Sequence, residues 1–378
     1  MEWIINTIYY VVPFLIILGI LVFVHELGHF LMARFLGVKV DEFSLGFGKE
    51  LWGFTDKAGT RWKLSAIPLG GYCKFFGDAD ASSSTNDDEK LQELSDEDKK
   101  VTFALQHPVK KLWIVLAGPL TNYLFAILIF ASIFYFMGKI NFPPVIGGIM
   151  PNSAAEQVGL QVNDKVLSIN GASIKHFSDI RKEVELTTDG QVDVELLRGE
   201  EVISLNFPLK AVEVVDNTGA KSSHMMLGIT SLNAVEIEKG DTSVVTALKE
   251  ATVECWELTT TTLRGLGQMV TGKRSGEEIG GIIRIAEMSG DITKQYGLLN
   301  LFVFMAILSV NLGLINLFPI PVLDGGHVVI YVVEMIFGRE LNEKLKENMF
   351  KFGLSFILLL MVYATWNDFV RLFNRWFS

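Results

Sequence analysis

The sequence predicts an α-helical polytopic membrane protein with about four transmembrane helices, a membrane-associated β-hairpin and one inserted α+β domain. Three observations support this fold class. The 378 residues are 49% hydrophobic and only 20% charged, and the mean hydropathy is +0.35. The apolar residues are gathered into four long runs, and the composition between the second and third runs is that of a soluble domain.

The four apolar runs cover residues 4–35, 111–138, 298–321 and 350–366, and the last is the shortest. A bilayer core of ~30 Å is crossed by about 20 helical residues, so each run is a candidate span. The first run could instead be a cleaved signal peptide, but residues 1–10 contain no Lys or Arg to form the basic n-region of such a signal. We therefore expect four membrane helices.

The distribution of basic residues predicts the orientation of these spans. Arg34, Lys39, Lys110 and Lys111 lie between the first two runs, and a second basic group at residues 339–351 lies between the last two. Arg and Lys near span ends favour the cytoplasmic side. We expect the carboxyl end of the first span near the cytoplasm, with both termini and the soluble domain on the outer side.

The segment between the first two spans contains two different patterns. Residues 60–77 alternate apolar and polar side chains, which predicts a small hairpin near the membrane surface that turns at Gly70 and Gly71. Residues 78–100 are rich in acids and poor in apolar side chains, which is typical of a solvated loop.

Residues 143–208 contain turn signals at Asn163, Asn170 and Gly199 and helical pieces near Ala154 and Ser178. This segment resembles a PDZ domain, and its most specific part is "NSAAEQVGLQVNDKVLSINGASI" (residues 152–174). PDZ modules bind an extended chain by adding it as a strand to an exposed sheet edge. We predict that this loop and edge are formed by Gly147, Gly148 and Ile149. Alternatively, the module only braces the protein or blocks access to it. The predicted domains are residues 1–140, 141–210 (PDZ), 211–297 (connecting and amphipathic membrane-surface segment) and 298–378.

The first run contains the motif "HELGH", His25 to His29. Ionisable groups in a membrane helix are costly and indicate a functional site. Residues four apart share one helical face, so both imidazoles can bind one Zn²⁺, and Glu26 can accept a proton from the attacking water. A bound cation would offset the cost of burying these side chains.

A catalytic zinc usually has three protein ligands, so a further one is needed. The stretch "NLFPIPVLDGGH" (residues 316–327) follows the third span on the predicted cytoplasmic side. We predict Asp324 as the third ligand, because Pro319 and Pro321 break the helix and allow the chain to turn inward. His327 is the alternative ligand.

These motifs together resemble the site-2 protease family of intramembrane zinc metalloproteases. The resemblance rests on "HELGH", on "LDG" at residues 323–325, on "GPLTN" at residues 118–122 and on "IGGIIRIA" at residues 279–286, and it covers nearly the whole chain. The best-known members carry two tandem PDZ domains. Here residues 143–208 provide one clear copy.

The resemblance implies hydrolysis of peptide bonds within or near transmembrane segments, with zinc as cofactor. Implied substrates are single-pass membrane proteins such as anti-sigma factors, after a prior site-1 cleavage, and remnant signal peptides. The implied location is the bacterial inner membrane, with the lipid bilayer as surroundings and the PDZ domain in the periplasm. Asn122 and Asn316 could bind a substrate backbone or, alternatively, bond neighbouring helices, and the hairpin carrying Gly70 and Gly71 could pair with an unwound substrate.

Two other classes of function are compatible with parts of the sequence. One is a membrane-tethered metallopeptidase acting on soluble or periplasmic chains, and the other is a non-catalytic PDZ scaffold in the membrane. A net charge of −10 argues against nucleic acid as a partner. The two cysteines, Cys73 and Cys255, are too few and too far apart for a disulfide framework.

Overall fold

The computed structural model describes residues 2–78, 94–187, 190–215, 221–232, 236–238, 243–272, 276 and 279–377. Most of the acidic stretch predicted to be a solvated loop lies outside these residues. Its end forms the short helix α3 (Asp96–Val101). The hydroxyl of Ser95 caps this helix by accepting a hydrogen bond from the Asp98 N–H, at 3.1 Å.

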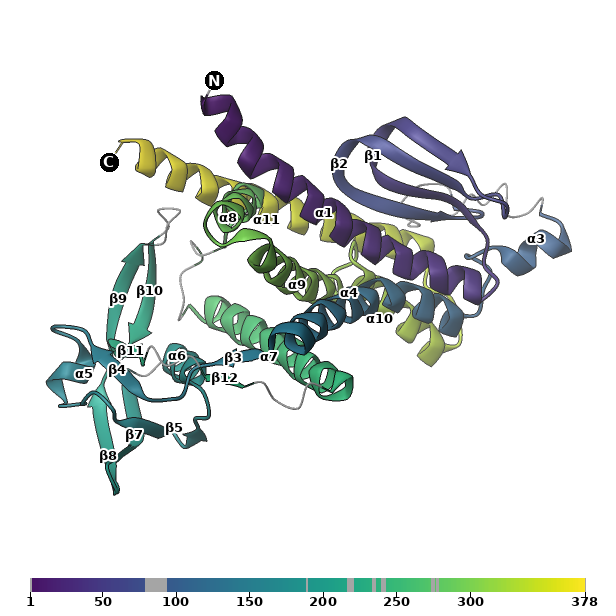
Figure 1. Cartoon of the computed structure of the whole chain (residues 1–378). Helices are drawn as coiled ribbons and strands as arrows, with labels where there is room; N and C mark the ends of the chain where they lie inside the picture. Colours follow the sequence, from purple (N-terminus) through teal and green to yellow (C-terminus); the bar gives the residue numbers. More distant parts are fainter. Residues whose placement is uncertain are drawn as a thin grey trace. The chain divides into compact units, whose positions relative to one another are not determined.

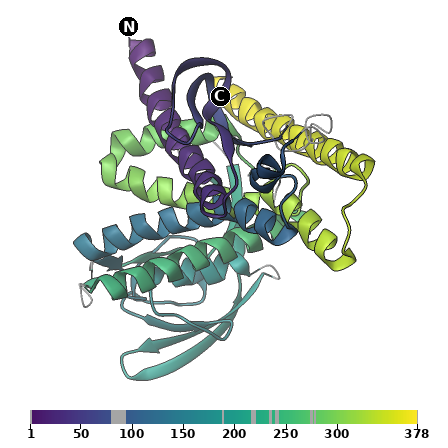
Figure 2. The ribbon, with the colours of Figure 1, turned by 90° about the vertical axis from the view of Figure 1, so that its right-hand side faces the viewer.

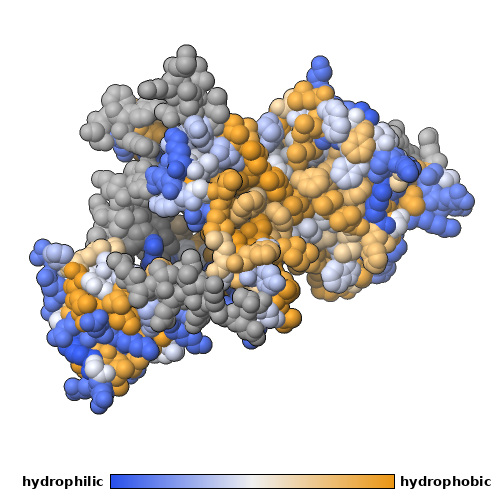
Figure 3. All heavy atoms as spheres, in the orientation of Figure 1, coloured by the Kyte–Doolittle hydropathy of each residue, from blue (hydrophilic) through white to orange (hydrophobic). Residues whose placement is uncertain are grey.

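Within the described residues, four helices are long and apolar enough to cross a membrane, as the sequence predicted. They are α1 (Glu2–Phe35), α4 (Pro108–Met137), α9 (Gly297–Asn316) and α11 (Glu343–Phe377). Large apolar side chains such as Ile16, Leu31 and Leu359 lie exposed on their outer faces. Hydrophobic side chains accordingly predominate over the middle of the helical part in Figure 3. An apolar surface of this extent is typical of a membrane protein.

The chain forms two compact units, which we describe separately. The first comprises residues 1–130, 251–259 and 280–368, and the second comprises residues 131–250, 260–279 and 369–378. The first unit contains the HELGH and LDG motifs, and the second contains the PDZ-like segment.

Helix α1 is the central element of the first unit. It packs against the sheet formed by β1 (Val40–Thr55) and β2 (Arg61–Phe75), and also against α8 (Ile282–Gln295) and α9 (Figure 1). A buried cluster joins α1, the sheet, α4 and α10 (Asp324–Phe337), and includes Phe30, Phe43 and Ile114. These contacts fix the part of α1 that carries the HELGH motif.

Helix α4 makes close contacts with its neighbours in the same unit. A Cβ atom at Gly28 of α1 would lie 2.4 Å from the Ala117 carbonyl oxygen, so only glycine permits this approach of α1 to α4. The hydroxyl of Ser309 in α9 donates to the Asn122 carbonyl at 2.8 Å. Beside α4 lies the middle of α7 (Val244–Val270), where the hydroxyls of Tyr123 and Thr259 are 3.1 Å apart (Figure 2).

The β1–β2 sheet is more elaborate than the predicted hairpin, because each strand bends and pairs twice. Residues 42–45 of β1 pair with residues 71–74 on one side and with residues 61–64 on the other, and residues 50–55 pair with residues 61–65. The predicted turn at Gly70 and Gly71 is wrong, since both lie inside β2 and the connecting turn is at residues 56–60. Gly70 instead provides a bend, with φ of +95°.

The second unit contains a PDZ-like module with its own apolar core. Four strands, β5 (Lys165–Ile169), β6 (Ala172–Ser173), β7 (Gln191–Arg198) and β8 (Glu201–Pro208), form a sheet in the order β6-β5-β7-β8. Two helices accompany them, α5 (Ala154–Gln157) and α6 (Phe177–Leu186), where helical pieces were predicted. The predicted turns are confirmed by the positive φ of Asn163, Asn170 and Gly199.

The predicted edge strand is already paired in the structure. Strand β4 (Ile146–Ile149) forms an antiparallel pair with β11 (Ile229–Ser231), and a Cβ at Gly147 would lie 2.2 Å from the Ser231 carbonyl oxygen. On its other side, the Ile146 N–H donates to the Asp164 carbonyl at 2.9 Å. Gly147, Gly148 and Ile149 therefore do not form the expected free edge, because a strand far along the chain occupies it.

The module also extends beyond residue 210, the predicted boundary. Leu227 belongs to its buried core, and Ile229 of β11 packs against that core. Between β8 and β11 lie β9 (Lys210–Val215) and β10 (Lys221–Met226), which pair with each other. A further pair joins β3 (Lys139–Asn141) to β12 (Glu236–Glu238).

Candidate metal centre

Helix α1 places His25 and His29 one turn apart on the same face. Both side chains are buried, and their Nε2 atoms lie 3.3 Å apart. Polar rings can occupy this position because α4 supplies hydrogen-bond partners for them. The His29 Nδ1 atom is 2.9 Å from the Ile114 carbonyl oxygen, and the His25 Nδ1 atom is 3.1 Å from the Asn122 amide.

Asp324 reaches the imidazoles from α10, of which it is the first residue. The two glycines that follow it allow the chain to turn sharply after α9. A Cβ atom at Gly325 would lie 2.3 Å from the carbonyl oxygens of Leu317 and Phe318, and one at Gly326 would lie 2.3 Å from that of Ile320. The LDGG sequence is thus suited to folding the start of α10 back onto the preceding turn.

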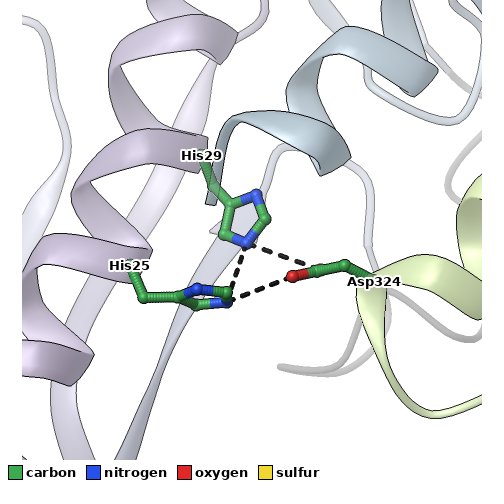
Figure 4. A group of neighbouring side chains, drawn as sticks. All are labelled: His25, His29 and Asp324. Atoms are coloured by element: carbon green, nitrogen blue, oxygen red, sulfur yellow. Dashed lines mark hydrogen bonds and ion pairs between the residues drawn. The ribbon is translucent and has the colours of Figure 1, made fainter. Parts of the chain in front are cut away.

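The three side chains converge on one point (Figure 4). Asp324 Oδ2 lies 3.1 Å from His25 Nε2, and Asp324 Oδ1 lies 3.5 Å from His29 Nε2. Ligands bound at 2.0–2.1 Å to a tetrahedral zinc are about 3.3 Å from one another. The observed separations of 3.1, 3.3 and 3.5 Å therefore fit a shared zinc ion.

The chemistry of the Asp324 carboxyl also fits a metal ligand. Its Oδ2 atom is buried and makes no hydrogen bond of regular geometry, as expected for an atom directed at an ion rather than at a donor. Two imidazoles and one carboxylate form a donor set that zinc accepts, with a fourth position left for water or substrate.

A cavity of about 310 Å³ opens beside the three predicted ligands. Glu26 lines this cavity, as do Gly70 and Gly71 from β2. A Cβ atom at Gly71 would lie 2.8 Å from Val22 Cγ1 and 3.3 Å from Glu26 Cγ. Strand β2 therefore lies close to Glu26, the predicted proton acceptor. The absence of a side chain at Gly71 permits this approach.

The other predicted residues lie at different distances from the centre. His327 and Asn316 line the same cavity, but His327 is not among the three side chains that converge. Asn122 is fully buried, and its amide nitrogen lies 3.1 Å from His25 Nδ1, while its binding of substrate stays a prediction. Gly147, Gly148 and Ile149 belong to the second unit.

Sequence reasoning did not identify the contribution of Gly118. A Cβ atom at this position would lie 2.3 Å from His29 Nε2, so the missing side chain provides the space for the imidazole. Phe103 and Tyr331, which line the cavity, were also missed. The GPLTN motif carried a usable signal, because Gly118 and Asn122 are four residues apart and face the two imidazoles.

A helix bearing HExxH, joined by a carboxylate from a second helix and set among apolar helices, defines a membrane-bound zinc metallopeptidase. The sequence profile of Peptidase family M50 matches residues 13–360. The chain therefore belongs to this family, the site-2 proteases. This confirms the family, the peptidase class and the zinc cofactor predicted from the sequence.

Similar chains from bacteria carry the name of zinc metalloproteases. One from Rhizobium meliloti is 40% identical over 376 residues, covering 99% of this chain and 100% of the relative. One from Agrobacterium fabrum is 41% identical over 363 residues, covering 95% of each chain. A solved PDZ domain of the SdrC-like protein from Listeria monocytogenes matches 25% of this chain and 94% of its own, with 20% identity and a TM-score of 0.19. A narrower resemblance, to the bacterial regulator of sigma-E protease, stays a prediction from the sequence.

Proposed function

We propose that this metalloprotease is an intramembrane protease, which hydrolyses peptide bonds within or near transmembrane segments of other membrane proteins. The observation that carries the proposal is the position of His25 and His29. They belong to a helix that is itself long and apolar enough to span a bilayer, at residues 9–35. A soluble-type peptidase tethered by one helix would instead carry its motif in a water-exposed domain.

The residues of the site have different roles in hydrolysis. When bound, Zn²⁺ supplies a Lewis acid that polarises the scissile carbonyl and makes a water molecule more acidic. His25, His29 and Asp324 would hold the ion. Glu26, which borders the cavity next to His25, accepts a proton from the attacking water and transfers it to the departing amine.

Access to the substrate backbone is the second requirement. The amides of a transmembrane helix are bonded within the helix, so the segment must unwind before water can attack it. Residues 70–73 of β2 line the cavity, and among the described strands none pairs with their outer edge. An unwound substrate segment can add to this edge as a further strand. Asn316, also at the cavity, can bond a freed amide of the substrate.

The resemblance to site-2 proteases and the distribution of charges extend the proposal to its cellular setting. The proposed location is the bacterial inner membrane, where the chain is a multi-pass protein with the site near the cytoplasmic side and the PDZ-like module in the periplasm. Substrates are single-pass proteins such as anti-sigma factors, shortened by an earlier cleavage, and remnant signal peptides. The outcome is regulated release or clearance of these membrane segments.

Purified full-length chain in lipid vesicles provides the test, with wild type compared to Glu26→Gln. The substrates are a single-span polypeptide and the soluble, unfolded protein casein. We expect wild type to bind about one zinc per chain and to cut the spanning polypeptide within or near its apolar segment. Glu26→Gln should bind the same zinc and lose ~10²–10⁴-fold in turnover, because the proton acceptor is absent.

Two results would contradict the proposal. Cleavage of casein alone would indicate a tethered metallopeptidase that acts outside the bilayer. Absence of zinc, together with binding of the spanning polypeptide without cleavage, would indicate a membrane scaffold.

A further inference from the structure

One face of α4 contacts both predicted imidazole ligands. Ile114, Gly118 and Asn122 follow one another at intervals of four residues and therefore lie on the same side of the helix. The Ile114 carbonyl oxygen is 2.9 Å from His29 Nδ1, and the Asn122 Nδ2 atom is 3.1 Å from His25 Nδ1. Gly118, between them, leaves room for the His29 ring.

The tautomers of the two imidazoles follow from the direction in which their rings point. Both Nε2 atoms face Asp324, so these are the nitrogens available to an ion. A nitrogen that binds a metal uses its lone pair, and the proton of a neutral imidazole must then lie on the other nitrogen, Nδ1. Each Nδ1 therefore needs a hydrogen-bond acceptor. For His29 this acceptor is the Ile114 carbonyl, which cannot donate.

The same requirement determines how the Asn122 amide is oriented. The oxygen and nitrogen of an amide exchange places by a half-turn about the last side-chain bond, so the hydrogen-bond network decides which faces a neighbour. The Asn122 side chain is fully buried, with Nδ2 toward His25 and with Oδ1 directed away and without a hydrogen-bond partner. A half-turn of the amide exchanges these two atoms and removes no other hydrogen bond of the side chain. Only the contact with His25 selects the orientation, and a protonated Nδ1 requires the oxygen.

We infer that Asn122 is a positioning residue of the metal centre, which accepts a hydrogen bond from His25 Nδ1–H through Oδ1. The inference rests on the proposed zinc site and assigns α4 a part in it. The helix fixes one tautomer in each imidazole, through Ile114 for His29 and through Asn122 for His25. Both Nε2 lone pairs are thereby directed at the ion before it binds. Residues that orient histidine ligands in this way typically change metal affinity by ~10–100-fold when removed.

Connecting α4 to α9 is a different role, and the structure separates the two. The connection from Asn122 to α9 runs through its backbone, because the Ser309 hydroxyl donates to the Asn122 carbonyl oxygen. Replacing the Asn122 side chain leaves this connection in place. Replacing Ser309 removes the connection and leaves the contact with His25 intact. Ser309→Ala is therefore a matched control.

The test measures the zinc affinity of the purified full chain in detergent, by competition with a chelating dye. Asn122→Asp keeps an acceptor oxygen, whereas Asn122→Leu has a similar volume and no acceptor. We expect Asn122→Asp to bind zinc within a few-fold of wild type or more tightly, and Ser309→Ala to match wild type. Asn122→Leu should bind zinc ~10–100-fold more weakly. Asn122→Ala is a second acceptor-free variant in case the leucine disturbs folding.

The outcomes distinguish this inference from the proposed function. Wild-type affinity in both acceptor-free variants would overturn the role of Asn122. Equal losses in Asn122→Asp and Asn122→Leu would show that the amide donates rather than accepts, which also overturns it. Failure of wild type itself to bind zinc would instead contradict the proposed metal site.

Discussion

Gly118→Ala is the substitution for which the structure gives the clearest geometric consequence. The added Cβ would lie 2.3 Å from His29 Nε2 and 2.5 Å from its Cε1. Ordinary contact begins near 3.4 Å, so the ring must retreat by about 1.1 Å, the difference between 3.4 and 2.3 Å. Metal–ligand distances tolerate deviations of only about 0.2 Å. The displaced nitrogen can then no longer ligate zinc at its normal distance.

We expect Gly118→Ala to weaken zinc binding by at least ~10–100-fold, because loss of a ligand should cost no less than loss of a residue that orients one. Its fold should persist, since the clash involves the end of a side chain that can turn away. The assay combines zinc affinity, by chelator competition, with the thermal unfolding midpoint of the zinc-free protein. Gly19→Ala is the control, because a Cβ there meets nothing within 4 Å. Unchanged zinc affinity in Gly118→Ala would refute the deduced position of the His29 ring.

Three further predictions concern the ligands, the sheet edge and the PDZ-like module. Asp324→Ala should lower zinc content in metal analysis of the purified protein, whereas His327→Ala should leave it unchanged; the reverse pattern would make His327 the third ligand. Gly71→Val should lower peptide turnover at least ~10-fold with zinc retained, because the new side chain would press on Val22 and Glu26; normal turnover would contradict the role of this edge. Burial alone would raise the pKa of Asp164, but hydrogen bonds from Arg198 and the Gln161 N–H outweigh it and lower the pKa below its ordinary 3.8. The Asp164 carboxylate thus stabilises the folded module fully at pH values above 3.8, its ordinary pKa. This stabilisation is lost as the pH falls through the lowered pKa of the folded state. Asp164→Asn should therefore reduce hydrogen-exchange protection of β5 and β7 at pH 7, with a smaller difference from wild type in acid; a constant difference would exclude this linkage.

The parts of the fold that the sequence predicted depend on local patterns. Four apolar runs of sufficient length predicted α1, α4, α9 and α11, and the four-residue spacing of His25 and His29 placed both on one helical face. Asp324 required a second argument, that a carboxylate beside two prolines could turn toward the first helix. Each of these inferences uses residues close together in the chain or a requirement of zinc for a further ligand.

The parts that the sequence did not reveal depend on pairing between distant segments. Nothing in the glycine-rich strand at residues 146–149 indicates that residues 229–231 occupy its edge. The double pairing of β1 and β2 likewise arises from bends that alternation of side chains does not encode. Asn122 was recognised as an unusual polar residue, but its partner was identifiable only once α1 and α4 were placed side by side. Long-range packing therefore decided its role.

The pairing of β3 with β12 has a consequence for how the PDZ-like module is attached. Residues 139–141 lead into the module and residues 236–238 lead out of it, and the two segments are hydrogen-bonded as neighbours. The module thus hangs from a two-stranded stem, and its two points of attachment are about 5 Å apart. A module attached in this way can be enlarged, duplicated or exchanged without changing the path of the helices before and after it.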